Sequence, residues 1–437
     1  MQKKLSTAIV WLRNDLRFQD QQSFFLACQN HDYVFAYYAF EPKDYEDTQW
    51  GFKKTGKFRL QFLIQTLNAL KAELAKNNIT LITEVRSATL GIPFWVKNLK
   101  AKAVYFQKEW TYEEIIISKN IENTLSKDIE FHCHHDQFLY HPDDIPMDII
   151  KLPQVFTEFR KKCEKYSLIR APFPQPKILT KSINFNQDFE IPSLSNFGYD
   201  SFEMHPHNVF PFIGGTDQAL NHLNYYFWET QKLSYYKKTR NGLLGSDYSS
   251  KFSPWLSLGS ISVRTIYDHV KKYEVKVAKN ESTYWLIFEL IWRDYFKYVS
   301  LKYGNKLFQI GGILDKKYCW KTEKNIFGKW AEGRTSEPFV NANMLELKKT
   351  GFMSNRGRQN VASYFSKNML MDWRMGAAYF ENQLIDYDVH SNWGNWMYVS
   401  GVGNDPRDRK FNIKFQAERY DPKGLYQKRW LQKTLFE

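Results

Sequence analysis

Residues 351–398 combine charged, amide and aromatic side chains in a way that an ordinary hydrophobic core does not. Arg358 follows a tight turn, Asp386 and Asp388 are two residues apart, and Asn392 comes shortly after them. Apolar and aromatic residues surround all four. Buried charges persist when they pair with one another or hold a polar ligand. The sequence therefore predicts that this stretch surrounds a large, polar, redox-active cofactor.

The predicted helix at residues 282–303 carries a second group of polar residues. It is apolar on nearly every side through its first half, which is typical of a buried helix, yet Glu289 lies there. Trp292 and Arg293 follow at i+3 and i+4. Glu289 and Arg293 could simply pair with each other. A carboxylate beside an indole also suits a pocket for a flat base that forms hydrogen bonds, and the helix alone leaves both interpretations open.

A run of hydroxyl groups and one cation before Pro254 could hold phosphate groups, and Tyr236 lies upstream of it. The run consists of Ser249, Ser250, Lys251, Phe252 and Ser253. Hydroxyls, backbone N–H groups and an ammonium ion are suitable phosphate ligands. Because serine and proline are also common at helix starts, an ordinary capped loop is the alternative.

Two features near the N-terminal strands are weaker. Glu109 comes just after the fourth predicted strand, where open α/β sheets place ligands, but a surface carboxylate near a helix N-terminus is the simpler interpretation. His132 and His134 share one face of a strand and no suitably spaced ligand follows them, so we expect no metal site.

The positions of these residues depend on two kinds of region. Residues 5–135 alternate β-rich runs (8–12, 33–38, 80–85, 103–106, 129–133) with helical patterns (56–76, 111–126). Alternating strands and helices predict a doubly wound parallel sheet in an α/β domain. The first strand is not followed by a GxGxxG motif, so a dinucleotide site of the usual kind is not expected there.

The remainder of the chain has a different pattern. Residues 136–206 are predicted to be an interdomain linker, because their second half is rich in proline and polar residues. Residues 207–437 are predicted to form an all-helical domain, with helices at 217–230, 262–273, 282–303, 339–349, 359–383 and near Trp330.

Composition limits the partners and the compartment. Aromatic residues make up 17% of the 437 residues, which favours a flat ligand, and 61 basic against 47 acidic residues give a net charge of +14. This charge favours a polyanion such as nucleic acid, although lysine-rich surfaces alone could account for it. Four scattered cysteines, no signal peptide and no run of 18 apolar residues predict a cytoplasmic protein without a membrane span. We expect a monomer.

Several long motifs make the sequence resemble the photolyase/cryptochrome family, specifically its cryptochrome DASH type. They are VWLRNDLR at 10–17, GFKKTGKFR, YKKTRNGLLG, YSSKFSPWLSLG, FELIWRDYF, TGFMSNRGRQNVASYF and LIDYDVHSNWGNW. They span essentially the whole chain. The resemblance implies a flavin adenine dinucleotide (FAD) bound by the helical domain with its adenine folded over the isoalloxazine.

The resemblance also assigns cofactor roles. Tyr236 and residues 249–253 would hold the phosphates. Arg358 and Asp386 would form an ion pair beside the isoalloxazine, and Asn392 would face its N5 atom, where an amide can donate or accept a hydrogen bond. Glu289, Arg293 and Asp388 would line the same pocket.

Three tryptophans match the electron-relay chain of the family: Trp396, Trp373 and Trp320. The alternative for each is core packing, the usual role of a buried tryptophan. The motif around Trp320 is weaker than the others.

The repair pocket implied by the resemblance consists of Glu289, Trp292, Asn355 and Arg356. In related photolyases an extruded pyrimidine dimer enters it and receives an electron from the excited reduced flavin. Gln359 and Tyr398 stand where duplex-repairing enzymes carry Met and Trp, and this more polar wall agrees with a preference for single-stranded DNA. DNA contacts are thus expected from Trp292, Asn355, Arg356, Gln359 and Tyr398.

The expected function is therefore blue-light-driven repair of cyclobutane pyrimidine dimers, mainly in single-stranded DNA. The alternative is a blue-light photoreceptor with little repair activity. Members of this type often carry 5,10-methenyltetrahydrofolate as an antenna between the domains, and Glu109 matches the position that holds its pterin. Ser336, Asn341 and Glu346 stand where the family commonly shows Gly, Asp and Arg, and losing that Asp and Arg together suggests a changed surface or helix-start interaction rather than a lost active site.

Overall fold

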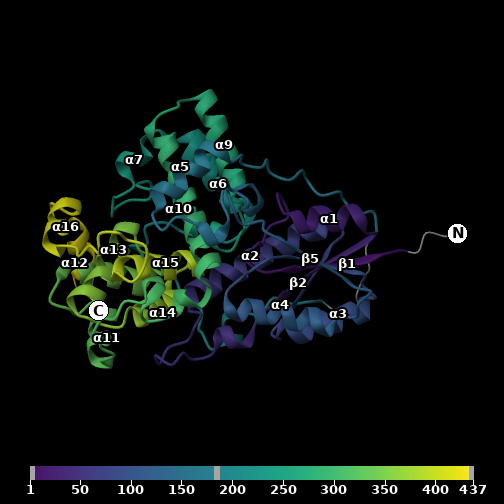
Figure 1. Ribbon diagram of the computed structural model, residues 1–437, viewed down its shortest axis with the longest axis horizontal. Helices are drawn as coiled ribbons and strands as arrows, with labels where there is room; N and C mark the ends of the chain where they lie inside the picture. The colour runs from purple at the N-terminus through teal and green to yellow at the C-terminus, as the bar shows by residue number, and fades with distance from the viewer. Residues whose placement is uncertain (1–4, 182–187, 433–437) are drawn as a thin grey trace.

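The computed structural model describes residues 5–181 and 188–432 (Figure 1). Its N-terminal part is a five-stranded, entirely parallel sheet with the strand order β3-β2-β1-β4-β5. The strands are β1 (Thr7–Leu12), β2 (Tyr33–Ala39), β3 (Thr80–Glu84), β4 (Ala103–Gln107) and β5 (Glu130–His134). The predicted doubly wound α/β fold is confirmed, and each predicted strand agrees with an observed one to within one or two residues at either end.

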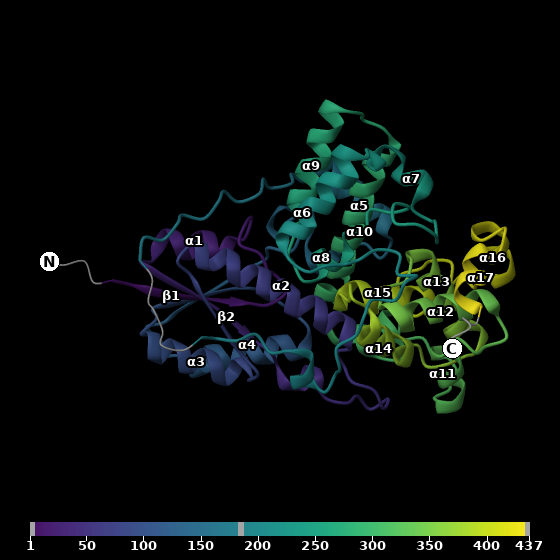
Figure 2. The same ribbon diagram turned by 180° about the vertical axis from the view of Figure 1, so that it is seen from behind.

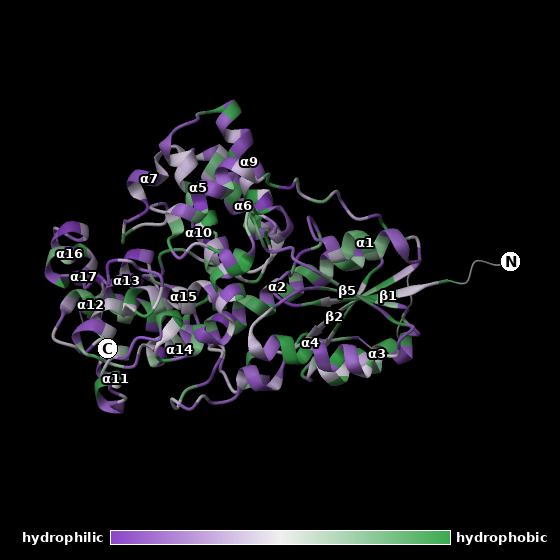
Figure 3. Ribbon diagram, viewed as in Figure 1, coloured by the Kyte–Doolittle hydropathy of each residue, from purple (hydrophilic) through white to green (hydrophobic). Residues whose placement is uncertain are grey.

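Alternation along β1 explains why helices cover both faces of the sheet. Ala8, Val10 and Leu12 belong to one buried cluster, which includes α1 (Gln22–Asn30) and α2 (Lys57–Lys76). Ile9 belongs to a second cluster, which packs under α3 (Ala88–Leu99). α4 (Tyr112–Thr124) lies beside α3 on this second face (Figures 1 and 2). Successive strand residues point to opposite faces, so both sides of the sheet need an apolar cover. Figure 3 shows green, hydrophobic stretches where the sheet and its covering helices meet.

The C-terminal part is helical, as predicted. Its longer helices are α6 (Thr216–Asn224), α9 (Val263–Lys276), α10 (Glu281–Tyr303), α11 (Lys324–Ala331), α12 (Pro338–Thr350), α13 (Asn355–Ser363), α14 (Trp373–Gln383), α15 (Val389–Ser400), α16 (Ile413–Tyr420) and α17 (Leu425–Leu431). Two short ones, α7 (Tyr236–Thr239) and α8 (Ser253–Ser257), flank the predicted phosphate run. No helix in residues 5–181 and 188–432 is long and apolar enough to span a lipid bilayer.

The single helix predicted at residues 359–383 is wrong. The chain forms α13, continues as a π-helical turn at Tyr364–Asn368, and breaks before α14. Leu370 takes a left-handed backbone with φ of 54°, which no α-helix accommodates, and the Asp372 side chain then caps α14 by accepting from Arg374 N. The apolar pattern continues across the break because both helices face the same core.

Residues 136–206 contain more structure than a linker suggests. Helix α5 (Phe156–Tyr166) lies within this range and packs on α10, where the Phe156 and Trp292 rings stack 3.6 Å apart. The buried Asp294 of α10 accepts hydrogen bonds from the backbone N–H groups of Leu139 and Tyr140. This segment therefore anchors α10, the central helix of the site.

Candidate cofactor and DNA site

A cavity of about 560 Å³ opens between α10, the 248–253 segment, α13 and α15. A smaller cavity of about 90 Å³ shares Arg358, Asp386 and Asp388 with it and extends to Asn392 and Trp396. The residues predicted from 351–398 to surround a cofactor therefore line one continuous region.

The predicted Arg358–Asp386 ion pair is present. Arg358 Nη2 lies 2.9 and 2.8 Å from the two carboxylate oxygens of Asp386, whose side chain is 2% exposed. Arg358 also donates from Nε to Met353 O, which fixes the plane of the guanidinium group. Such a two-point contact is the arrangement in which a buried charge pair is stable.

Hydrogen bonds and one ion pair to neighbouring helices fix the side chains of Asp388 and Asn392. Asp388 accepts from Ser391 N at the start of α15 and pairs with Lys297 Nζ at 3.1 Å. Burial alone would raise the pKa of Asp388, but the Lys297 ammonium ion holds it well below its ordinary value. Asn392 donates from Nδ2 to Ala377 O of α14. Both side chains are thus positioned before any ligand arrives.

The predicted phosphate run contains a buried lysine whose ammonium group makes no hydrogen bond within the described chain. Lys251 is 3% exposed, and its Nζ has no hydrogen-bond partner among the described residues. It lies 3.4 Å from the centre of the Tyr248 ring, whose hydroxyl is likewise unpartnered. Burial lowers the pKa of Lys251 to about 7. A phosphate group at this place would supply the missing partner, so these residues fit a dinucleotide cofactor.

Glu346 is not at the surface, so the predicted surface interaction is wrong. The side chain is 1% exposed and accepts from the Tyr426 hydroxyl at 2.6 Å. Burial raises the pKa of Glu346 to about 7, with Lys251 and Arg358 opposing the rise. Glu346 therefore interacts electrostatically with Lys251 of the phosphate run.

Glu289 does not pair with Arg293. It pairs with Arg240, whose Nη2 lies 2.6 Å from Glu289 Oε1, and burial raises the pKa of Glu289 against this pairing. Arg293 instead donates to the backbone oxygens of Gln137 and Leu256. The Glu289 side chain is 25% exposed and lines the 560 Å³ cavity together with the half-buried Trp292.

The residues predicted to contact DNA lie around the same cavity. Arg356 donates to Gln359 Oε1 at 2.9 Å and to Asn241 Oδ1 at 3.0 Å. Asn355 is exposed, and the Tyr398 hydroxyl accepts from Arg409 at 2.6 Å. The cavity rim is therefore polar and basic.

Two of the three predicted relay tryptophans lie deep in the core. Trp396 is 2% and Trp373 0% exposed. A Cβ atom on Gly376 would lie 2.2 Å from the Trp396 ring, so this ring rests against α14 one turn after Trp373. Trp320 is half-buried, and its neighbour Lys321 pairs with Met371 just before α14. Of the three, Trp396 lines the small cavity, Trp373 is enclosed in the core and Trp320 is the most exposed.

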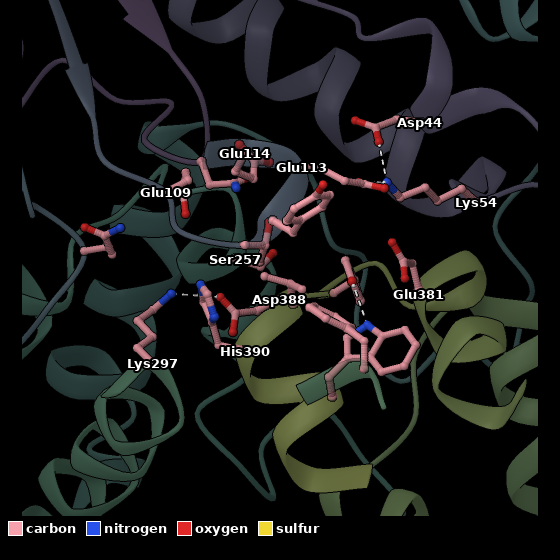
Figure 4. Close-up of a pocket in the computed structure, with 18 of the residues that line it drawn as sticks. Asp44, Lys54, Glu109, Glu113, Glu114, Ser257, Lys297, Glu381, Asp388 and His390 are labelled. Atoms are coloured by element: carbon pink, nitrogen blue, oxygen red, sulfur yellow. Dashed lines mark hydrogen bonds and ion pairs between the residues drawn. The ribbon is translucent and has the colours of Figure 1, made fainter. Parts of the chain in front are cut away.

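A third cavity, of about 500 Å³, lies between the α/β and helical parts (Figure 4). Glu109 lines it at 7% exposure and accepts from Gln107 Nε2, so it is not the surface carboxylate that the simpler interpretation predicts. His390 stacks on Trp110, with ring centres 4.6 Å apart, and neither nitrogen of His390 has a hydrogen-bond partner in the described chain. These buried polar atoms suit a flat ligand with several hydrogen-bonding groups.

The histidine cluster contributes to packing. His132 stacks on Tyr105 at 4.6 Å and contacts Glu130 at 2.7 Å. Within the described ranges no group of three or more His, Cys, Asp or Glu side chains is arranged to hold a metal ion.

Several residues of the site are not predicted from the sequence. Arg240 and Lys297 pair with Glu289 and Asp388 from other turns or helices. Arg240 does lie inside the YKKTRNGLLG motif, which could have suggested it. Lys297 lies eight residues after Glu289 on the same apolar helix. A charged residue in a segment expected to be buried could likewise have suggested a role for Lys297 in the site.

Two family models match the chain. One is described as "DNA photolyase" and matches residues 8–177; the other is described as "FAD binding domain of DNA photolyase" and matches residues 285–434.

The chain is also similar to known proteins over nearly its whole length. It is 45% identical to a "Cryptochrome DASH" of Synechocystis sp., covering 97% of this chain and 87% of that protein, and 43% identical to one of Danio rerio, covering 97% and 83%. A crystal structure of a Synechocystis sp. cryptochrome superposes with a TM-score of 0.94 at 44% identity, covering 99% and 89%. A class III photolyase from Agrobacterium tumefaciens superposes with a TM-score of 0.85 at 25% identity, covering 99% and 87%.

Proposed function

Because the chain belongs to the photolyase/cryptochrome family, within its cryptochrome DASH group, and binds FAD, we propose that it is a light-driven lyase. Its substrate is the cyclobutane pyrimidine dimer, chiefly in single-stranded DNA. The observation that carries this proposal is Glu289, a carboxylate held by Arg240 at the wall of the cavity that also contains Arg358 and Asp386. A receptor that only absorbs light has no use for such a group.

The cavity walls divide into a cofactor side and a lesion side. Arg358, Asp386 and Asn392 hold the isoalloxazine, while Lys251 and its neighbouring hydroxyls hold the pyrophosphate. When bound, FAD supplies light absorption and one-electron chemistry at the junction of the two sides. The chain's own residues bind and orient the lesion there.

On the lesion side, Glu289 orients the damaged bases by hydrogen bonds to their polar edges. Its raised pKa favours a shared or transferred proton as negative charge develops on the bases. Trp292, whose opposite face is covered by Phe156, offers an indole surface for stacking.

Single-strand preference follows from the polar rim. Flipping bases out of a duplex costs a few kcal/mol, and stacking on apolar residues offsets that cost. Gln359 is engaged by Arg356, and the Tyr398 hydroxyl by Arg409, so both present polar groups where large apolar surfaces would otherwise stack. Arg240, Arg356 and Arg409 supply positive charge for the phosphate backbone.

Trp396, Trp373 and Trp320 serve as the relay that returns the flavin to its reduced state. Glu109 and the interdomain cavity hold a methenyltetrahydrofolate antenna, with His390, which stacks on Trp110, in its wall.

The test is a repair assay on ultraviolet-damaged oligothymidine, single- and double-stranded, under blue light and in darkness. We expect light-dependent repair of the single strand and weaker repair of the duplex. Glu289→Gln and Glu289→Ala should lose repair while keeping the flavin spectrum, and Lys238→Met, which removes an exposed cation on α7, is the matched control. Absence of repair on both strand forms, with flavin bound and photoreduced, would refute the lyase and favour a photoreceptor.

A further inference from the structure

Trp373, the middle tryptophan of the proposed relay, contacts a further tryptophan that is not part of that relay. Its ring meets the ring of Trp393 edge to face, with centres 5.8 Å apart and planes at 76°. Trp393 is half-buried on α15 and lines the interdomain cavity. Trp320 contacts the ring of Tyr318 instead, at 5.2 Å. An electron vacancy on Trp373 can therefore leave by two aromatic routes.

The second route ends in a hydrogen-bonded phenol. Trp393 Nε1 donates to the Tyr387 hydroxyl oxygen at 3.2 Å, and the Glu381 carboxylate lies near enough to the Tyr387 hydroxyl to add to the rise in its pKa that burial causes. Tyr387 is 6% and Glu381 8% exposed, and both line the interdomain cavity, in whose wall Figure 4 labels Glu381. All three side chains also line the interdomain cavity proposed for the antenna.

We propose that Trp393, Tyr387 and Glu381 form a second branch of the relay, in which Tyr387 is the terminal electron donor and Glu381 accepts its proton. The proposal rests on the flavin photoreduction described above. Once Trp396 has given an electron to oxidised flavin, Trp373 refills Trp396 and Trp393 refills Trp373. Tyr387 then transfers one electron to Trp393 and its phenolic proton to Glu381. The products are a neutral tyrosyl radical, a protonated carboxyl group, three restored indoles and a flavin that holds one additional electron, so charge and protons balance.

The surroundings of Tyr387 favour this step. A phenol gives up an electron readily only when a base takes its proton, and the base must be within hydrogen-bond reach. Burial raises the pKa of Glu381, which makes its carboxylate a stronger proton acceptor, while Lys54 and Arg59 favour the charged form. Arg59 also lies 4.7 Å from the Tyr387 ring centre. Buried at the cavity wall, the radical is shielded from external reductants, in contrast to one on the half-exposed Trp320.

The test is flash excitation of the protein loaded with oxidised FAD, followed by transient absorption and electron paramagnetic resonance. We expect a tyrosyl radical that forms more slowly in D2O. Tyr387→Phe and Trp393→Phe should abolish it, and Glu381→Gln should leave a tryptophan radical in its place. Tyr318→Phe is the matched control, because Tyr318 neighbours Trp320 and hydrogen-bonds Asp408. That variant should keep the signal.

The inference is overturned if the wild type gives no tyrosyl radical, or if the radical survives Tyr387→Phe. It is equally overturned if Tyr318→Phe alone removes the signal. Should Tyr387→Phe fail to bind flavin, Trp393→Phe decides the question with Tyr387 intact. Repair by chemically reduced wild-type protein uses no relay, so failure of the lyase proposal and failure of this branch are separate results.

Discussion

Replacing Lys251 with methionine should weaken FAD binding and at the same time stabilise the protein without FAD. The Lys251 ammonium group is 3% exposed and unpartnered in the described chain, and burial lowers its pKa from 10.5 to about 7. That difference means that burial destabilises the charged form of Lys251 by about 5 kcal/mol. Methionine fills a similar volume without the charge. The cofactor-free variant therefore escapes this cost, while the variant with FAD loses a charge-assisted hydrogen bond.

The pH dependence has a definite sign. Without FAD, the folded state releases the Lys251 proton near pH 7 and the unfolded state near 10.5, so stability rises with pH between these values. A bound phosphate raises the pKa of Lys251 again, so FAD binding takes up a proton above about pH 7. Affinity should then fall as pH rises, by up to about tenfold per pH unit. Glu346 has a pKa of about 7 without FAD. The negative charge of a bound phosphate raises that pKa, so Glu346 also takes up a proton at the lower end of this window.

Fluorescence titration of cofactor-free protein with FAD measures the first effect, and thermal unfolding measures the second. A lost hydrogen bond to a charged group is worth about 1.5–3 kcal/mol, so the Lys251→Met dissociation constant should rise by about ten- to hundredfold. The pH slope above neutrality should disappear in the variant. Lys238→Met, at an exposed position, is the control for charge loss. If Lys251→Met binds FAD as tightly as wild type with an unchanged pH slope, Lys251 does not hold the phosphates.

Three further outcomes are expected. Glu289→Gln should keep the fold and the flavin but lower the repair yield by about ten- to hundredfold, the effect of losing one charged hydrogen bond; an unchanged yield per absorbed photon contradicts its role. Trp373→Phe should block photoreduction of oxidised flavin, followed by its absorbance, yet leave repair by chemically reduced protein intact. Gly376→Ala places a Cβ atom 2.2 Å from the Trp396 ring, so chemical denaturation should show a loss of about 1–3 kcal/mol, and equal stability would mean that this contact relaxes freely.

Much of the fold can be predicted from local pattern. The strands β1 to β5 are short apolar runs bounded by polar residues, and parallel pairing follows because helices separate them. α10 is predictable because its apolar positions continue for more than five turns. The break between α13 and α14 is not, since the left-handed Leu370 has no sequence signal comparable to a glycine.

The candidate site divides in the same way. Arg358, Asp386, Asp388 and Asn392 stand close together in the chain among apolar residues, so the sequence alone indicates a polar ligand at this place. Tryptophan positions, by contrast, are compatible with either packing or electron transfer.

The partners of these residues are decided by tertiary structure alone. Glu289 could pair with Arg293 one turn away on the same helix, but the two point to different partners, Arg240 and the backbone oxygens of Gln137 and Leu256. Trp373 meets Trp393 only because α14 and α15 pack together. Local periodicity determines which face of a helix is buried. It does not show which distant side chain packs against that face. The proposed electron and proton transfers depend on those tertiary contacts.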